Sequence, residues 1–87
     1  TSYQLSVAYP NPFNPVTTME FIIPEAGNVN VQVLNLKGQV ISTLLSGHQA
    51  ANTYNLTWDA SNIPSGIYFV KAESMEYIQT QKLMLIK

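Results

Sequence analysis

Apolar and polar residues alternate with a period of two along several short stretches of the chain. In the clearest of these, Val29, Val31 and Val33 alternate with Asn30 and Gln32. Successive side chains of a β-strand point to opposite faces of a sheet, so this period predicts strands with one buried face. No stretch of the sequence has the spacing of an amphipathic helix.

About seven strands are predicted in this way, separated by turn residues at intervals of roughly 8–12 positions. They cover residues 3–9, 17–23, 29–33, 39–45, 54–58, 67–73 and 77–86. Sequential strands at this spacing favour an all-β fold, an antiparallel β-sandwich that forms one domain over residues 1–87. A small closed barrel is the architectural alternative.

The same pattern indicates which side chains fill the core. The residues expected to face inward include Met19, Phe21, Ile23, Tyr54, Leu56 and Trp58. Residues 67–73 begin with apolar side chains on both faces, which is typical of a strand near the centre of a sheet. We therefore expect the core to lie between two layers, with this strand in the middle of one of them.

The turns carry their own signals. Three prolines within residues 10–15 exclude a central strand and predict an extended corner, with Phe13 as its anchor in the core. Gly38 predicts a tight hairpin that requires a positive φ angle. Apolar residues break the period of two at 34–36, where we expect a bulge or a bend. Residues 46–52 are predicted to form a loop.

Charged residues are scarce: four Lys, no Arg, five Asp or Glu, and a net charge of −1. Such a chain lacks the basic face that nucleic-acid binding needs. With no Cys and one His, it cannot form the common structural zinc sites. A hydrophobic content of 46% argues against disorder, and no apolar run approaches the roughly 18 residues of a membrane span.

Candidate catalytic groups are few. His48 lies in the predicted loop with no acidic or thiol partner near it in sequence, so we interpret it as a solvated side chain. The carboxylates are scattered along the chain, at Glu20, Glu25, Asp59, Glu73 and Glu76. They do not suggest the facing pair that a glycosidase requires. The sequence therefore favours a non-catalytic domain.

Two candidate binding sites have simpler interpretations. Residues 59–62, Asp-Ala-Ser-Asn, offer oxygen ligands for calcium, but a turn stabilised by Asp and Asn explains them without a metal. An aromatic platform for sugars would use Tyr54, Trp58, Tyr68 and Phe69, yet the face they share with Leu56 favours core packing. We expect no metal and no cofactor.

Several segments, taken in order, resemble one family. They are residues 9–15, 21–24, 27–29, 33–40, 44–47, 58–59, 65–69 and 81–87, of which Pro10-Asn11-Pro12 and Ser65-Gly66-Ile67-Tyr68-Phe69 are the most specific. This set is similar to the C-terminal sorting domain of type IX secretion cargo, found in Bacteroidetes and related bacteria. The immunoglobulin-like domain of the flagellar hook-capping protein is a relative of that family.

The resemblance implies an immunoglobulin-like β-sandwich at the end of a larger secreted protein. Such a domain is the address read by the outer-membrane translocon, and a sortase-like protease cleaves it after export. The implied partners are therefore the translocon, this protease and an upstream cargo domain of the same chain. The implied location is the cell surface or the medium, reached through the periplasm of a Gram-negative bacterium. The sequence itself reads as a piece of a larger protein.

Family positions can be carried over to this sequence. The fold positions are Pro10, Asn11, Pro12, Gly38, Gly66 and Tyr68, and the segment read by the translocon comprises Lys82, Leu83, Met84, Leu85, Ile86 and Lys87. The chain departs from the family in having Gln81 and Gln39 where basic residues are usual. We expect the last strand to be read by strand addition to a receptor sheet, although the same residues could simply close the sandwich.

Two other functions remain open from the sequence alone. The domain could be a structural immunoglobulin-like spacer or interaction module of the hook-capping type. It could also be a carbohydrate-binding module of a secreted glycosidase.

Overall fold

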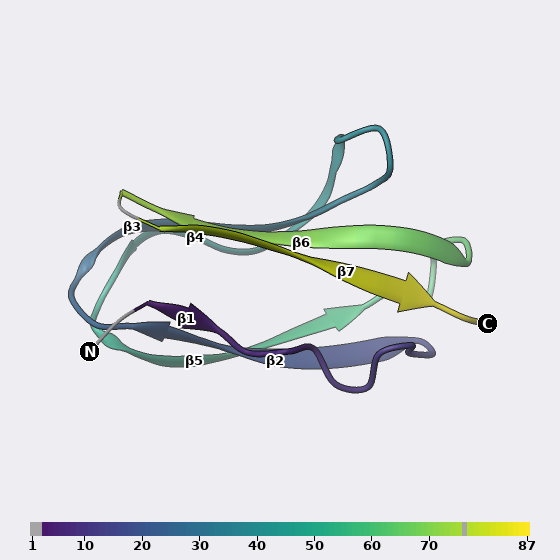
Figure 1. The fold of residues 1–87 in the computed structure, drawn as a ribbon, viewed down its shortest axis with the longest axis horizontal. Coiled ribbons are helices and arrows are strands. Elements are labelled where there is room, and N and C mark those ends of the chain that lie inside the picture. Colours follow the sequence, from purple (N-terminus) through teal and green to yellow (C-terminus); the bar gives the residue numbers. More distant parts are fainter. Residues whose placement is uncertain (1–2, 76) are drawn as a thin grey trace.

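The computed structural model describes residues 3–75 and 77–87, so Glu76, in the predicted turn at 74–76, lies outside the described residues. Within them, seven strands form two antiparallel sheets stacked face to face (Figure 1). The strands are β1 (Gln4–Leu5), β2 (Val16–Ile23), β3 (Gly27–Leu34), β4 (Val40–Gln49), β5 (Asn52–Asp59), β6 (Gly66–Ser74) and β7 (Ile78–Leu85). The sheet orders are β1-β2-β5 and β4-β3-β6-β7.

This strand order is that of an immunoglobulin-like sandwich. β2 and β5 pair in one sheet while β3, β6 and β7 pair in the other, as the B–E and C–F–G strands do in that fold. β4 extends the second sheet by pairing with β3 rather than lying beside β5. The two sheets remain separate, so the predicted sandwich is confirmed and the closed barrel is not formed.

The core lies between the sheets and is built from the period-two faces that the sequence predicts. On β3, Val29, Val31 and Val33 are all buried. Other buried apolar residues are Leu5, Ala8, Phe13, Met19, Phe21, Ile23, Leu56, Trp58, Ala60, Tyr68, Val70, Ala72, Leu83 and Leu85. β6 pairs on both sides, with β3 and β7, which confirms its predicted position inside a sheet.

Three aromatic rings meet near one end of the core. The ring of Trp58 lies 5.5 Å from that of Phe13 and 5.5 Å from that of Tyr68, measured between centroids. Phe13 is therefore the core anchor that the corner was predicted to supply. Tyr68, near the start of β6, donates its hydroxyl to the Pro64 carbonyl at 2.6 Å, which is the arrangement known as a tyrosine corner.

The prediction of a loop over 46–52 is wrong. β4 continues to Gln49, and its last residues pair with the start of β3, for example His48 with Asn28. Main-chain pairing in an exposed edge strand needs no apolar side chains, so this part of β4 has no period-two signature. Only Ala50 and Ala51 separate β4 from β5.

The predicted irregularity near residues 34–36 is present, but it begins earlier. The pairing of β3 with β4 shifts between Val31 and Gln32 and again between Val33 and Leu34. At each shift β4 has one additional residue, Leu44 and then Ile41. These two bulges explain why β4 lacks a regular alternation of buried and exposed side chains.

The main chain of the predicted strand over 3–9 follows β2 but forms a regular strand over only part of its length. Only Gln4 and Leu5 form a ladder with β2, and Tyr9 adds a single bridge to Thr18. In between, the Ala8 N–H donates to the side chain of Gln81 on β7, in the other sheet. The N-terminal segment therefore stays beside β2 while a side chain of the other sheet reaches it.

We expect Tyr68→Phe to lower the free energy of unfolding by about 1–2 kcal/mol, because it leaves the Pro64 carbonyl without its partly buried donor. Tyr54→Phe is the matched control, since the Tyr54 hydroxyl also donates to a carbonyl four residues earlier, that of Ala50, but at an exposed site. Urea unfolding measures both. Equal losses in the two variants would contradict a special contribution from the Tyr68 corner.

Candidate functional site

The residues predicted to be read by a translocon form the end of β7 and the two residues that follow it. Leu83 and Leu85 are buried in the core, whereas Lys82 and Ile86 are exposed and Met84 is half-buried. The strand therefore presents one row of side chains to the core and another to the outer face of the sheet. Figure 1 shows the end of β7 approaching the layer that contains β1, β2 and β5.

β7 is an edge strand, and the proline-rich corner lies along its outer edge. The Asn11 side chain donates to the Lys82 carbonyl at 2.9 Å and accepts from the Met84 N–H at 3.0 Å. The Phe13 main chain donates to the Met84 carbonyl at 2.9 Å and accepts from the Ile86 N–H at 2.9 Å. These four bonds occupy the outward-facing main-chain groups from the Lys82 carbonyl to the Ile86 N–H.

Gln81 extends this contact toward the N-terminus. Its side-chain oxygen accepts from the Ala8 N–H at 2.6 Å, and its side-chain nitrogen donates to the Ser6 carbonyl at 2.9 Å. A basic side chain has no acceptor and could not make both bonds. Gln81 therefore forms a two-way clamp that the sequence did not reveal.

Lys87 lies against the loop between β5 and β6. Its main-chain N–H donates to the Ser65 hydroxyl at 3.2 Å, and its ammonium group donates to the Ser61 carbonyl at 2.7 Å. This loop is also where Asp59 accepts hydrogen bonds from the Ser61 N–H at 3.0 Å and from the Ser61 hydroxyl. The segment that follows β7 is thus positioned by two serines.

The local contacts of Asp59 determine its ionisation. The hydrogen bond from the Ser61 hydroxyl, and then that from the Ser61 N–H, hold the pKa of Asp59 below its ordinary value of 3.8. The charge of Lys87 acts in the same direction with a smaller effect. The side chain thus caps its own turn, as the sequence interpretation held, and Asp59 belongs to no group of three His, Asp or Glu side chains among residues 3–75 and 77–87.

The six fold positions that the resemblance implies lie in three places. Pro10, Asn11 and Pro12 form the corner beside β7, where the Pro10 carbonyl accepts from the buried Thr17 hydroxyl at 2.7 Å. Gly38 lies in the hairpin turn with a φ of 82°, which confirms the predicted positive angle. Gly66 and Tyr68 begin β6. Trp58 connects the corner with the start of β6, because its ring contacts both Phe13 and Tyr68.

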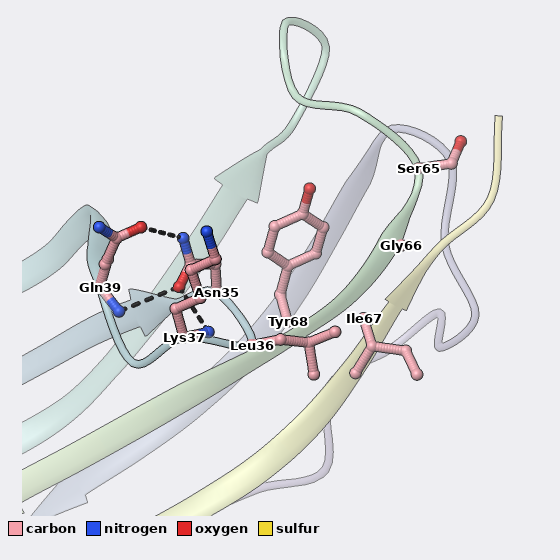
Figure 2. Close-up of a pocket in the computed structure, with 8 residues that line it drawn as sticks. All are labelled: Asn35, Leu36, Lys37, Gln39, Ser65, Gly66, Ile67 and Tyr68. Carbon is pink, nitrogen blue, oxygen red and sulfur yellow. Dashed lines mark hydrogen bonds between the residues drawn. The ribbon is translucent and has the colours of Figure 1, made fainter.

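The hairpin turn and the start of β6 line an open pocket with a volume of about 290 Å³ (Figure 2). Its lining residues are Asn35, Leu36, Lys37, Gln39, Ser65, Gly66, Ile67 and Tyr68. The Asn35 side chain organises the turn by accepting from the Lys37 and Gln39 N–H groups at 2.9 and 3.0 Å. It also donates to the Gln39 side-chain oxygen at 2.8 Å, so a Gln at position 39 completes the turn.

The other sequence candidates lie apart from these features. His48 is exposed near the end of β4. Trp58 and Tyr68 are 4% and 8% exposed, so neither ring can stack on a sugar, while Tyr54 and Phe69 are half-buried. In the part of the chain that the structure describes, no helix is long and apolar enough to cross a membrane.

Comparison with known proteins identifies one family. The model of the secretion system C-terminal sorting domain matches residues 7–87. No curated protein matches the chain. The family match begins inside the segment that lies along β7 and includes every residue of the corner, the hairpin turn and the last strand.

We expect Ser61→Ala to raise the pKa of Asp59 toward its ordinary value, because it removes the Ser61 hydroxyl, whose hydrogen bond is the largest cause of the shift. A folded pKa below the unfolded one stabilises the fold above the ordinary value and loses this contribution as the pH falls through the folded value. The parent and the variant should therefore differ less in free energy of unfolding below about pH 3 than at neutral pH. NMR titration and acid unfolding measure both effects, with Ser65→Ala as control, and an unchanged Asp59 titration in Ser61→Ala would refute this cause.

Gly38→Ala should lower the free energy of unfolding by about 1 kcal/mol, because the left-handed backbone conformation at φ 82° disfavours a Cβ atom. No neighbouring atom lies within 4 Å of an added Cβ, so only backbone strain contributes. Gly27→Ala is the matched control, with equal space and no positive φ. Denaturant unfolding of both variants tests this, and an equal effect at the two positions would count against it.

Proposed function

The chain belongs to the family of secretion system C-terminal sorting domains, and we propose that Lys82–Lys87 is the part of it that the translocon reads. Domains of this family are non-catalytic C-terminal signals for type IX secretion, which carries proteins of Gram-negative Bacteroidetes to the cell surface or the medium. Membership of the family gives the class of function, which is a sorting signal. The identity of the residues that the translocon recognises is our proposal.

The observation that carries the proposal is that buried and outward-facing side chains alternate along the end of β7. Leu83 and Leu85 are 0% and 1% exposed, so they fix the strand in the core. Lys82, Met84 and Ile86 alternate with them on the outer face, where a receptor can reach them. The strand is thus held rigidly while presenting one cationic and two apolar side chains in a row.

The implied partners follow from this arrangement. The domain is attached to an upstream cargo of the same chain, whose export it directs. A sortase-like protease then separates cargo from signal. Because β1 already begins at Gln4, cleavage that leaves the sandwich intact falls before that strand. The corner positions Pro10 and Pro12, with Gly38, Gly66 and Tyr68, serve to build the fold that presents β7.

The test fuses the domain to a reporter that is delivered to the periplasm of a bacterium with a type IX system. We expect export of the parent fusion, and a loss of about tenfold or more for Lys82→Glu and for Ile86→Asp, because a contact worth about 1.4 kcal/mol changes binding tenfold. Deleting residues 82–87 would remove two core leucines and test folding instead. The substitutions leave both leucines in place.

Two control variants match these changes. Lys37→Glu reverses an exposed charge at the hairpin turn, and Val40→Asp alters a residue whose exposure of 51% equals that of Ile86. Both should be exported like the parent. Equal export of the β7 variants and these controls, with all variants folded, would show that the end of β7 is not read.

A further inference from the structure

The outer edge of β7 is the edge that strand addition would use, and the chain itself occupies it. We propose that residues 9–12 are a detachable cover on this edge, and that the receptor replaces the contacts of this cover with an extended strand of its own, while Ala8 and Phe13 stay in the core. This inference rests on the proposed recognition of Lys82–Lys87. It specifies how the recognised strand becomes available and what kind of partner segment it accepts.

The cover is held on β7 mainly by side chains rather than by a main-chain ladder. Asn11 bonds to β7 through its side-chain amide, and the flanking contacts are the main-chain pair of Phe13 and the Gln81 clamp on Ser6 and Ala8. Pro10 and Pro12 have no N–H to donate, so this segment cannot form a regular ladder with β7. By contrast, β6 pairs with β7 over eight consecutive residues.

Burial within the cover shows where it can open. Ala8 and Phe13 are 2% and 3% exposed and are held in the core. The four residues between them, 9–12, are all exposed, and Tyr9 and Val7 reach 79% and 78%. Tyr9 and Pro10 are bonded to Thr18 and Thr17 of β2 rather than to β7. The contact of this segment with β7 therefore rests on the exposed Asn11 side chain and opens locally at a low free energy compared with the core strands. Opening of residues 9–12 uncovers Lys82 and Met84 first.

The uncovered edge defines the chemistry of its occupant. The Lys82 carbonyl needs a donor and the Met84 N–H needs an acceptor, at the spacing of one extended strand. A polypeptide strand without proline supplies all of these from its main chain, which is recognition by β-strand addition. Such a partner replaces two side-chain contacts with a continuous ladder, so it competes well against the cover.

The approach to this edge is already open. By the alternation of the ladder, the main-chain groups of Ile78 and Thr80 also point outward, and both residues are exposed. No main-chain partner for these groups is found within residues 3–75 and 77–87. An incoming strand can therefore pair there first and then displace the Asn11 contacts toward Met84.

The opposite edge of the same sheet is less suitable. β4 carries two bulges, and Gly47 has a φ of 91°. Bulges of this kind twist an edge away from regular pairing and protect it against strand addition. The straight edge that remains is that of β7, which is the strand with the candidate recognition residues.

The first measurement is amide exchange on the intact domain. Asn11→Ala removes both side-chain bonds to β7 at an exposed position, and Gln81→Ala independently removes the clamp on Ser6 and Ala8. Both should raise exchange about tenfold at the Phe13 and Ile86 amides, because each lost bond shifts the opening equilibrium. Neither substitution touches the bond partners of these two amides directly. Amides in the centre of β6 should not change.

Asn14→Ala is the matched control, because Asn14 is also exposed and also precedes a proline, whereas the bonds from the corner to β7 come from Asn11 and Phe13. It should leave exchange as in the parent. Unchanged exchange at Phe13 and Ile86 in both Asn11→Ala and Gln81→Ala would overturn the idea of a detachable cover.

The second measurement is export of the same variants as reporter fusions in type IX-competent cells. With the cover loosened, Asn11→Ala and Gln81→Ala should be exported faster than the parent, by several-fold, and Asn14→Ala should equal it. Faster exchange combined with unchanged or slower export would overturn the replacement by a receptor strand. Failure of the parent fusion to be exported would instead refute the proposed function, while the exchange result would still test the cover.

Discussion

The position of Phe13 joins the two sheets of this sandwich at the side where β1 and β7 lie. Its ring packs on Trp58 in the core, and its main chain pairs with Met84 and Ile86 at the edge of the other sheet. One residue thus connects the proline-rich corner, the aromatic end of the core and the last strand. Without it, the side between β1 and β7 would be bridged by the side-chain amides of Asn11 and Gln81 and by the Tyr77 hydroxyl, which accepts from the Leu5 N–H.

The contacts at the edge of β7 explain why uncharged polar residues outnumber charged ones in this chain. The chain has 28 Asn, Gln, Ser and Thr residues against nine charged ones. An amide side chain can donate and accept at once, so Asn11 and Gln81 substitute for the main-chain partners that prolines cannot supply. Asn35 does the same in the hairpin turn. A charged residue in these positions would satisfy one direction only.

Sequence reasoning predicted the layers well and the edges poorly, for a physical reason. The inward faces of β2, β3 and β5 follow from side-chain alternation, because burial itself selects apolar residues at every second position. The end of β4 was missed because pairing of His48 with Asn28 depends on main-chain groups that every residue has. The clamp by Gln81 was missed because residues 75 positions apart in sequence come together only in the fold.

The family resemblance located Asn11 and the last strand but could not say that they touch. Their contact changes what recognition requires. A signal that is a free strand can be bound as soon as it is met, whereas one whose edge is occupied is bound only as fast as the occupant leaves. Because Leu83 and Leu85 keep β7 in the core throughout, exchange of the cover alters the edge without unfolding the sandwich. The same strand can therefore close the fold and carry the signal, since its buried row performs one task and its outer row and edge perform the other.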